Sequence, residues 1–232
     1  MNSLDLYSNI EQYLDFSEEI STLYNAYDEI VSEINPSNLL DIGCGQGDFL
    51  LQIQNKNIKT FGIDLSNEQI KVCKAKGLDA QAIDVANITN KYDCATAVFD
   101  VLNYMDKDNL IKFLQDTYNT LNKNGYFIFD INSLFGFEEV AQGTLNIDID
   151  DKFIALDAYF EDEKLTTNIT LFEKTSNNLY NKTQNAITQY YHDKDTLTAL
   201  LNDIGFRVDK IVHFHLHSTD EADKYIFIAY KC

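Results

Sequence analysis

One stretch decides the fold of this chain: Leu39-Leu40-Asp41-Ile42-Gly43-Cys44-Gly45-Gln46-Gly47-Asp48-Phe49-Leu50. Its first four residues read as a buried strand, its three glycines stand at alternate positions, and a helix follows from Asp48. A sharp turn from strand to helix needs backbone angles that a side chain disfavours, and a missing Cβ lets a ligand lie against the main chain. The first helical turn presents unpaired N–H groups and a partial positive charge. The stretch therefore predicts a ligand site, against the alternative of a structural turn that binds nothing.

The glycine spacing separates two kinds of ligand. A dinucleotide fingerprint places its third glycine one position after Gly47, where this chain has the acid Asp48, which would face a pyrophosphate. Asp41 adds a second carboxylate just before the turn. Two carboxylates favour a ligand with positive charge and an amine over a diphosphate. The spacing therefore disfavours an NAD-dependent oxidoreductase.

An acid followed by alternating glycines resembles motif I of the class I S-adenosylmethionine (SAM)-dependent methyltransferases. The resemblance also covers the order of strands and helices from about residue 36 to the C-terminus. It implies that Asp41, Gly43, Cys44 and Gly45 bind SAM. It further implies an enzyme that moves a methyl group from SAM to an acceptor and leaves S-adenosylhomocysteine as a product.

The second strand, Lys59 to Ser66, carries an acid near its end. Asp64 lies seventeen residues after Gly47, near the place where a nucleotide-binding fold has the carboxylate that takes both ribose hydroxyls. Leu65 would then lie beside the adenine. The alternative is that Asp64 and Ser66 cap the helix that begins at Asn67.

The third strand, Asp79 to Val85, also carries an acid near its end. In the methyltransferases that this chain resembles, an acid at this place accepts the adenine amine, with the backbone of the next residue nearby. Asp84 and Val85 match that pattern. With Asp41 and Asp64, three strand-end acids are expected in register, which strengthens the cofactor prediction.

The fourth strand, Tyr92 to Phe99, is apolar enough to be central, and Phe99 at its end is expected at the cofactor. The following Asp100, Asn103 and Tyr104 resemble a group of bacterial small-molecule methyltransferases with Asp-x-x-Asn-Tyr here, and are expected to face the methyl-transfer region. The alternative is that Asp100 and Asn103 cap the next helix while Tyr104 packs. The end of the fifth strand, Tyr126 to Asn132, resembles the same group, and Asn132 could bind the substrate.

The remaining patterns complete an α/β fold. The resemblance implies a Rossmann-like seven-stranded sheet of order 3-2-1-4-5-7-6, with the last strand antiparallel. We expect a helical arm over residues 1–35, a SAM-binding domain over 36–132 and 190–232, and an inserted lid over 133–189. The insert carries four strand-like runs separated by polar turns such as Asp162-Glu163. Within the arm, Tyr7, Tyr13 and Phe16 could fold over the cofactor, although core packing is the simpler role.

Composition limits the partners of the chain. With 37 acidic and 18 basic residues, the formal charge of −19 repels phosphate backbones and anionic lipid, so nucleic acid and membrane are excluded as partners. The four cysteines form no C-x-x-C pair, and the N-terminus lacks a signal-peptide pattern. A cytoplasmic location is expected, with a small-molecule partner and a possible homodimer through the inserted sheet.

No residue stands out as the general base. His213, His215 and His217 alternate and would share one face of a strand, but no matching Cys or Asp pair is nearby and no metal is expected. Methyl transfer needs collinear reactants more than acid–base help, and Tyr104, Asp100 and His192 are reachable as bases in principle. The sequence favours a SAM-dependent methyltransferase with a small N or O acceptor. The competing hypothesis is a non-catalytic SAM-binding or interaction module.

Overall fold

The computed structural model describes residues 3–14, 16–177 and 179–232, so residues 1, 2 and 15 of the expected arm lie outside the described part. Seven strands form one sheet in the order β10-β11-β5-β4-β1-β2-β3. β1 to β5 run parallel, whereas β11 runs antiparallel to both of its neighbours. This order and direction confirm the predicted fold class. The strands are β1 (Asn38–Ile42), β2 (Lys59–Asp64), β3 (Ala80–Ala82), β4 (Tyr92–Ala97), β5 (Leu121–Asn132), β10 (Phe206–Phe214) and β11 (Lys224–Lys231).

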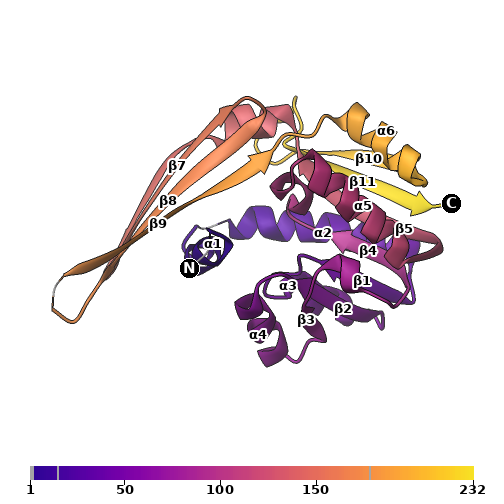
Figure 1. The fold of residues 1–232 in the computed structure, drawn as a ribbon, viewed down its shortest axis with the longest axis horizontal. Helices are drawn as coiled ribbons and strands as arrows, with labels where there is room; N and C mark the ends of the chain where they lie inside the picture. The colour runs from indigo at the N-terminus through magenta and orange to yellow at the C-terminus, as the bar shows by residue number, and fades with distance from the viewer. Residues whose placement is uncertain (1–2, 15, 178) are drawn as a thin grey trace.

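Helices cover both faces of this sheet, as Figure 1 shows. One apolar core lies between the sheet and the helices α2 (Ser17–Ile34), α3 (Asp48–Gln54) and α4 (Asn67–Ala75). A second core lies under α5 (Lys107–Thr120) and α6 (Lys194–Ile204). Because the central strands are buried on both faces, they read as continuous apolar runs, which is why the sequence located them.

The inserted sheet projects from the body as a long extension (Figure 1), and this sheet, not the N-terminal helical segment, is called the arm below. It is antiparallel, in the order β6-β7-β8-β9, with β6 (Gly143–Ile149), β7 (Lys152–Glu161), β8 (Lys164–Lys174) and β9 (Tyr180–Tyr190). Asp162 and Glu163 join β7 to β8 with φ angles of 51° and 60°, a geometry that suits a tight hairpin. The predicted antiparallel insert after the fifth strand is therefore confirmed.

The first helix, α1 (Ser3–Glu11), packs on the inserted sheet rather than on the main one. Its buried Leu6 and Ile10 join Ile154, Ile169 and Ile187 of the arm in a third apolar cluster. Tyr7 and Tyr13 pack against the same cluster, which agrees with the core-packing role for both side chains. The arm and α1 therefore form one unit.

Two predicted strands, the third and the fifth, differ from the observed strands by more than two residues at one end. β3 stops at Ala82 instead of Val85, because the Asp84 carboxylate accepts the N–H of Ala86 (2.8 Å) and starts the short 3₁₀ helix η1 (Val85–Asn87). β5 begins at Leu121 instead of the predicted Tyr126. The β4–β5 register shifts between Leu121 and Tyr126, so the residues between them interrupt the ladder as a bulge.

The three histidines do not share a strand face, so that prediction is wrong. β10 ends at Phe214, whose carbonyl accepts the N–H of Asp223 as the chain turns back (2.9 Å). The His213 ring packs against an aromatic neighbour in β11, while His217 Nδ1 lies 2.8 Å from Asp223 Oδ1. His215 Nδ1 contacts backbone carbonyls of the loop.

Among the described residues, no helix is both long and apolar enough to cross a membrane.

Candidate functional site

The glycine loop lies between β1 and α3 and is fastened to β2. The Ile63 carbonyl accepts hydrogen bonds from the backbone N–H groups of Gly43 (2.8 Å) and Cys44 (3.0 Å), and the Cys44 carbonyl accepts one from Gly47 (2.9 Å). Gly43, Gly45 and Gly47 have φ angles of 73°, 53° and 80°. The loop therefore contains the left-handed residues that its alternating glycines predict.

The space beside each glycine differs. A Cβ on Gly47 would lie 2.4 Å from Leu78 Cδ1, and a Cβ on Gly43 would lie 2.9 Å from Val101 Cγ2, so both glycines permit close packing. A Cβ on Gly45 would meet no described atom within 4 Å. Gly45 therefore faces open space, where a ligand can lie directly against the main chain.

Asp64 lies at the end of β2 on the rim of that open space. Its Oδ2 accepts the Gly45 N–H (3.0 Å) and its Oδ1 accepts the Ser66 N–H (2.8 Å). Ser66 Oγ in turn accepts the Gln69 N–H (3.4 Å) and caps α4. Helix capping is thus performed by Ser66, while the Asp64 carboxylate is joined to the glycine loop. Leu65, between them, is 67% exposed.

The three strand-end acids form a staircase rather than a level row, which corrects the expected register. Asp41 pairs with Gly62 across β1 and β2, so Asp64 lies two residues further along the strand direction. Asp64 pairs with Ala82 across β2 and β3, so Asp84 lies two residues further again. The acids rise in steps from the middle of the sheet to its edge.

Asp41, the innermost acid, is buried and does not reach the loop surface. Its carboxylate is 2% exposed and accepts a hydrogen bond from Thr96 Oγ1 (2.7 Å). Burial raises the pKa of Asp41 to about 7, against the lowering effect of the Thr96 hydroxyl, and the nearby Asp64 raises it further. Asp41 therefore acts beneath the loop, through its charge and its hydrogen bond.

The side chains of two other predicted cofactor residues are also buried. Cys44 is 8% exposed, and burial raises the pKa of its thiol, so its backbone is the part that borders the loop surface. Val85 is 5% exposed and belongs to the core at the start of η1. Asp84, just before it, holds η1 through its carboxylate. Any ligand contact of Cys44 or Val85 is thus a main-chain contact.

A strained corner follows β4. Phe99 and Asp100 both have positive φ angles, 65° and 48°, which is unusual for residues with a Cβ. The backbone N–H groups of both donate to the two oxygens of Asp130 on β5 (2.9 and 3.0 Å). Asp130 is fully buried and also accepts the Tyr27 hydroxyl from α2 (2.7 Å). The corner is therefore held in place by a carboxylate from the neighbouring strand.

Two of the four residues expected to bind substrate, Asp100 and Asn103, have side chains that bond to other parts of the protein. Asp100 ion-pairs with Lys224 and accepts the Gln189 side-chain amide (2.5 Å), so its carboxylate joins β11 to the arm. Asn103 is fully buried, donates to the Tyr190 carbonyl (2.7 Å) and accepts the Asn132 N–H (2.9 Å). Asn103 thus does not face the acceptor, because the backbone of β5 and β9 uses both ends of its amide.

The alternative for this segment is wrong about the helix caps but is confirmed in the packing of Tyr104. The helix α5 is capped by Asp106, whose Oδ1 accepts the Asn109 N–H (3.0 Å), and not by Asp100 or Asn103. Tyr104 ends the short 3₁₀ helix η2 (Val101–Tyr104) and packs on the cluster shared by α1 and the arm.

Acidic and phenolic groups of α1 and η2 interact electrostatically with one another and with acids beside the glycine loop. Burial raises the pKa of Tyr104 well above 10, and Asp100, Tyr7 and Glu11 raise it further. Burial likewise raises the pKa of Tyr7, followed by the charges of Glu11 and Asp100. The pKa of Glu11 is raised by desolvation and then by Asp48 and Asp64 beside the glycine loop. α1 therefore lies near both the loop and the strained corner.

His192 lies at the end of β9 with its ring directed at the backbone. Its Nε2 is 3.0 Å from the Leu102 carbonyl, which can only accept, so Nε2 carries the hydrogen. Burial lowers the pKa of His192, against the raising effect of the Leu102 carbonyl. The ring is consequently neutral and tied to η2.

Sequence reasoning missed four residues that interact with the predicted site residues: Asp130, Lys224, Gln189 and Glu11. A charged residue in the apolar run of the fifth strand was a usable signal for Asp130, because a buried carboxylate requires partners. Lys224 and Gln189 carry no comparable signal, since a single lysine or glutamine at a strand end is ordinary. In the sequence, Glu11 looked like one acid among many in the predicted N-terminal helical segment.

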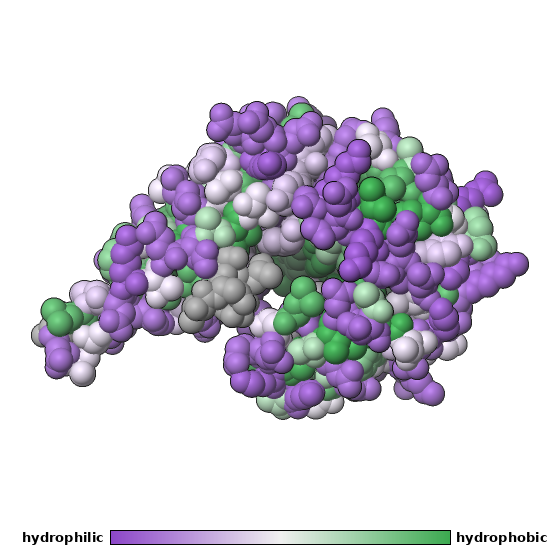
Figure 2. Space-filling view, viewed as in Figure 1, coloured by the Kyte–Doolittle hydropathy of each residue, from purple (hydrophilic) through white to green (hydrophobic). Residues whose placement is uncertain are grey.

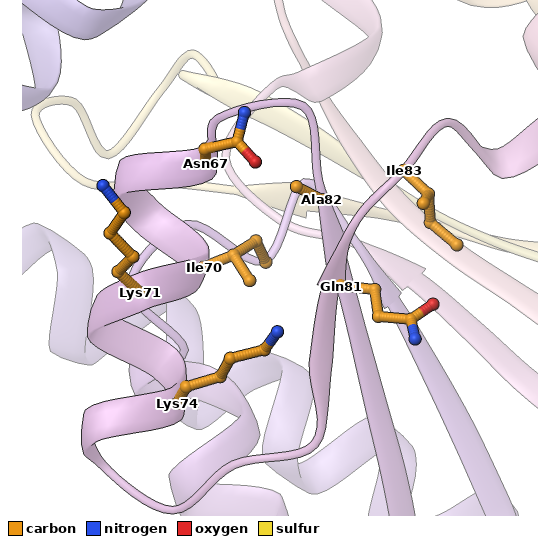
Figure 3. Close-up of a pocket in the computed structure, with 7 residues that line it drawn as sticks. All are labelled: Asn67, Ile70, Lys71, Lys74, Gln81, Ala82 and Ile83. Atoms are coloured by element: carbon orange, nitrogen blue, oxygen red, sulfur yellow. The ribbon is translucent and has the colours of Figure 1, made fainter.

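The shape of the surface agrees with these contacts. Figure 2 shows the surface hollowed between the part that carries α3 and α4 and the part that carries the arm. A separate cavity of about 450 Å³ lies at the sheet edge between α4 and β3 (Figure 3). Lys71 and Lys74 extend from α4 there, while Ile70 points toward Ala82. The lining of this cavity includes none of the three strand-end acids.

The chain matches a family model described as a methyltransferase domain over residues 16–211. It is 23% identical over 211 residues to a protein of Geobacillus sp. (strain WCH70) named as a putative methyltransferase, with 83% of this chain and 84% of that protein covered.

Two solved structures have a similar fold. The structure of a SAM-dependent methyltransferase from Clostridium acetobutylicum ATCC 824 matches with a TM-score of 0.81 and 22% identity, over 97% of this chain and 98% of that one. The sugar N-methyltransferase KedS8 from Streptoalloteichus sp. ATCC 53650 matches with a TM-score of 0.74 and 14% identity, over 99% and 93%.

Proposed function

We propose a small-molecule amine as the acceptor of this chain, which belongs to the methyltransferase domain family and uses SAM as its methyl donor. The observation that carries the proposal is the open space over Gly45, which Asp64 borders. The acids and phenols of α1 and η2 interact electrostatically with one another and with acids beside the glycine loop. This open space, called the crevice below, suits one cationic nucleoside and a compact acceptor beside it.

Residues along the staircase are proposed to hold the cofactor. Asp64 accepts both ribose hydroxyls, since each carboxylate oxygen has a lone pair beyond its present backbone bond. Asp84 accepts the adenine amine beside the Val85 backbone. The exposed Leu65 and the ring of Phe99 border the adenine.

The loop end of the crevice is proposed to hold the amino-acid part of SAM. The backbones of Gly43, Cys44 and Gly45 border it, and the buried Asp41 contributes negative charge from below. When bound, SAM supplies an electrophilic methyl group on a sulfonium, and the protein must align the acceptor with it and exclude water. The corner at Phe99 and Asp100, locked by Asp130, holds the strand end that borders the acceptor.

The surroundings of the expected bases favour an amine over a hydroxyl. Asp100 is ion-paired, the raised pKa of Tyr104 keeps its phenol protonated, and His192 is tied to the Leu102 carbonyl. A neutral amine attacks through its own lone pair and loses its proton after transfer, whereas a hydroxyl needs a base during attack. An amine acceptor therefore fits a site whose titratable groups are already engaged.

A compact acceptor follows from the shape and charge of the molecule. α1 and Tyr104 of η2 pack on the arm, and we propose that the segment 133–189 acts as a lid over the acceptor. The formal charge of −19 disfavours nucleic acids and attracts cationic amines. Among structures with a similar fold, one is a sugar N-methyltransferase and another an amino pentose methyltransferase.

Incubation with methyl-labelled SAM and a panel of small amines paired with their hydroxyl analogues tests this proposal. We expect label in the amines, at a rate that falls below the pKa of each amine as its lone pair is protonated. Labelling confined to the hydroxyl analogues would contradict the amine assignment. SAM binding by calorimetry without label in any acceptor would instead favour a non-catalytic SAM-binding module.

The glycine loop offers a matched pair of substitutions. Gly47→Ala should cost about 2–4 kcal/mol of unfolding free energy, because a positive φ and a clash with Leu78 act together. Gly45→Ala should cost about 1 kcal/mol through its φ alone, yet lower SAM affinity at least about tenfold, because the methyl group fills ligand space. Urea unfolding and calorimetry measure the two effects. Equal SAM affinity in Gly45→Ala and the parent would refute the placement of SAM over this residue.

A further inference from the structure

A buried lysine lies between two carboxylates at the end of the strained corner. Lys224 is the first residue of β11, and its side chain is 11% exposed. Its Nζ pairs with Asp100 Oδ1 and lies 3.1 Å from Asp130 Oδ2. Two carboxylates thus share one ammonium, and the triad Asp100–Lys224–Asp130 carries one excess negative charge. Buried charges are costly unless they are paired, so this imbalance calls for a further cation.

The excess charge is best assigned to Asp100. Asp130 is fully buried and is surrounded by four donors: the Tyr27 hydroxyl, Lys224 and the N–H groups of Phe99 and Asp100. Asp100 has two donors, the shared Lys224 and the neutral amide of Gln189, and its side chain is 14% exposed. The less satisfied carboxylate is therefore also the one closer to solvent.

The residue after Asp100 lies beside the glycine loop. The next residue, Val101, is so close to Gly43 that a Cβ on this glycine would lie 2.9 Å from its side chain. The charge of Asp100 contributes to the raised pKa values of Tyr7 and Tyr104, after burial. The field of this carboxylate therefore extends across the space where the reacting groups meet.

Building on the SAM placement proposed above, we propose that Asp100, held by Lys224 and Asp130, makes the site bind the cationic methyl donor in preference to the neutral thioether product. SAM carries a positive charge on sulfur that S-adenosylhomocysteine lacks, while the rest of the two molecules is alike. A unit charge close to the sulfonium in a poorly hydrated site changes the affinity of the cation by about tenfold or more. The same field would favour product release after each transfer.

The test is the ratio of the dissociation constants of S-adenosylhomocysteine and SAM, measured by calorimetry without an acceptor. Asp100→Asn keeps an oxygen for Lys224 but removes the charge, and should reduce this ratio about tenfold by weakening SAM alone. Sinefungin, which carries an ammonium in place of the sulfonium, should weaken in parallel with SAM. Asp203→Asn, on exposed α6, removes the same formal charge elsewhere and should leave the ratio unchanged.

A second variant keeps Asp100 and cancels the excess charge from the arm. Gln189→Lys places an ammonium where the amide now contacts Asp100, and should reduce the ratio as Asp100→Asn does. Equal losses of SAM and S-adenosylhomocysteine affinity in these variants would mean a structural role and overturn the proposal. A ratio within about twofold of the parent in either folded variant would overturn it as well.

Discussion

Asp64→Ala is expected to lower SAM affinity about 100-fold or more while the protein stays folded. The carboxylate would provide two charge-assisted hydrogen bonds to the ribose, each worth about 1.5–3 kcal/mol, and the methyl side chain provides none. The substitution also removes the hydrogen bond that the Gly45 N–H donates to Asp64 Oδ2 (3.0 Å). The glycine loop under the ligand therefore becomes less ordered. Calorimetric titration with SAM and S-adenosylhomocysteine measures the effect, and far-ultraviolet circular dichroism checks the fold.

Two controls separate the parts of this effect. Asp64→Asn keeps the volume and one accepting oxygen, so it should retain an intermediate affinity. Glu68→Ala removes an exposed acid on the same side of the sheet, where it pairs with Lys71 on the surface of α4, and should change affinity less than about twofold. If folded Asp64→Ala bound SAM as the parent does, the ribose assignment and the cofactor placement built on it would be wrong.

The sequence was sufficient to locate the central strands and the insert, whereas the order of the strands came from the family resemblance. Each central strand is a short apolar run followed by a helical pattern, and a parallel sheet buried on both faces permits few other arrangements. The hairpin at Asp162-Glu163 was visible because two polar residues interrupt two alternating runs. Local physics decides such features, so a single sequence reveals them.

Features that depend on tertiary contact were not derivable. Lys224 pairs with Asp100 from 124 positions away, and Asn103 donates to Tyr190 from 87 positions away. The polar residues after β4 were located correctly in the sequence, yet which of them turns inward depends on the backbone at Phe99 and Asp100. The carboxylate of Asp130 fixes that backbone, and no neighbouring residue indicates its partners.

Asp41 illustrates the same limit for an acid that the sequence did identify. Its place before the glycine loop suggested direct electrostatic contact with a ligand, but its side chain points to Thr96 of β4 and is 2% exposed. The sequence shows that Asp41 lies near the end of a strand, but the face of the sheet to which its side chain points decides whether the carboxylate is solvated. Burial has consequently given this carboxyl a pKa near neutrality.

Asp41→Asn should become more stable relative to the parent as pH rises. Burial raises the folded-state pKa of Asp41 to about 7 from its ordinary value of 3.8. Between these values the unfolded chain has released the proton that the folded protein keeps, so the contribution of Asp41 to stability declines with rising pH and is lost above about 7. From about pH 5.5 to 8.5 this decline amounts to about 2 kcal/mol, which the uncharged asparagine does not share.

Urea unfolding, followed by circular dichroism at several pH values, measures this difference between variant and parent. The pH range stops near 5.5 because a chain with 37 acidic and 18 basic residues approaches zero net charge in more acidic solution and becomes less soluble. Asp209→Asn, an exposed acid on β10, should follow the parent at every pH. A constant difference between Asp41→Asn and the parent would mean that Asp41 is ionised in the folded protein throughout. The charge beneath the glycine loop would then be permanent, and SAM affinity would not change through neutral pH. If Asp41 instead releases its proton when the cation binds, SAM affinity must rise with pH through neutrality.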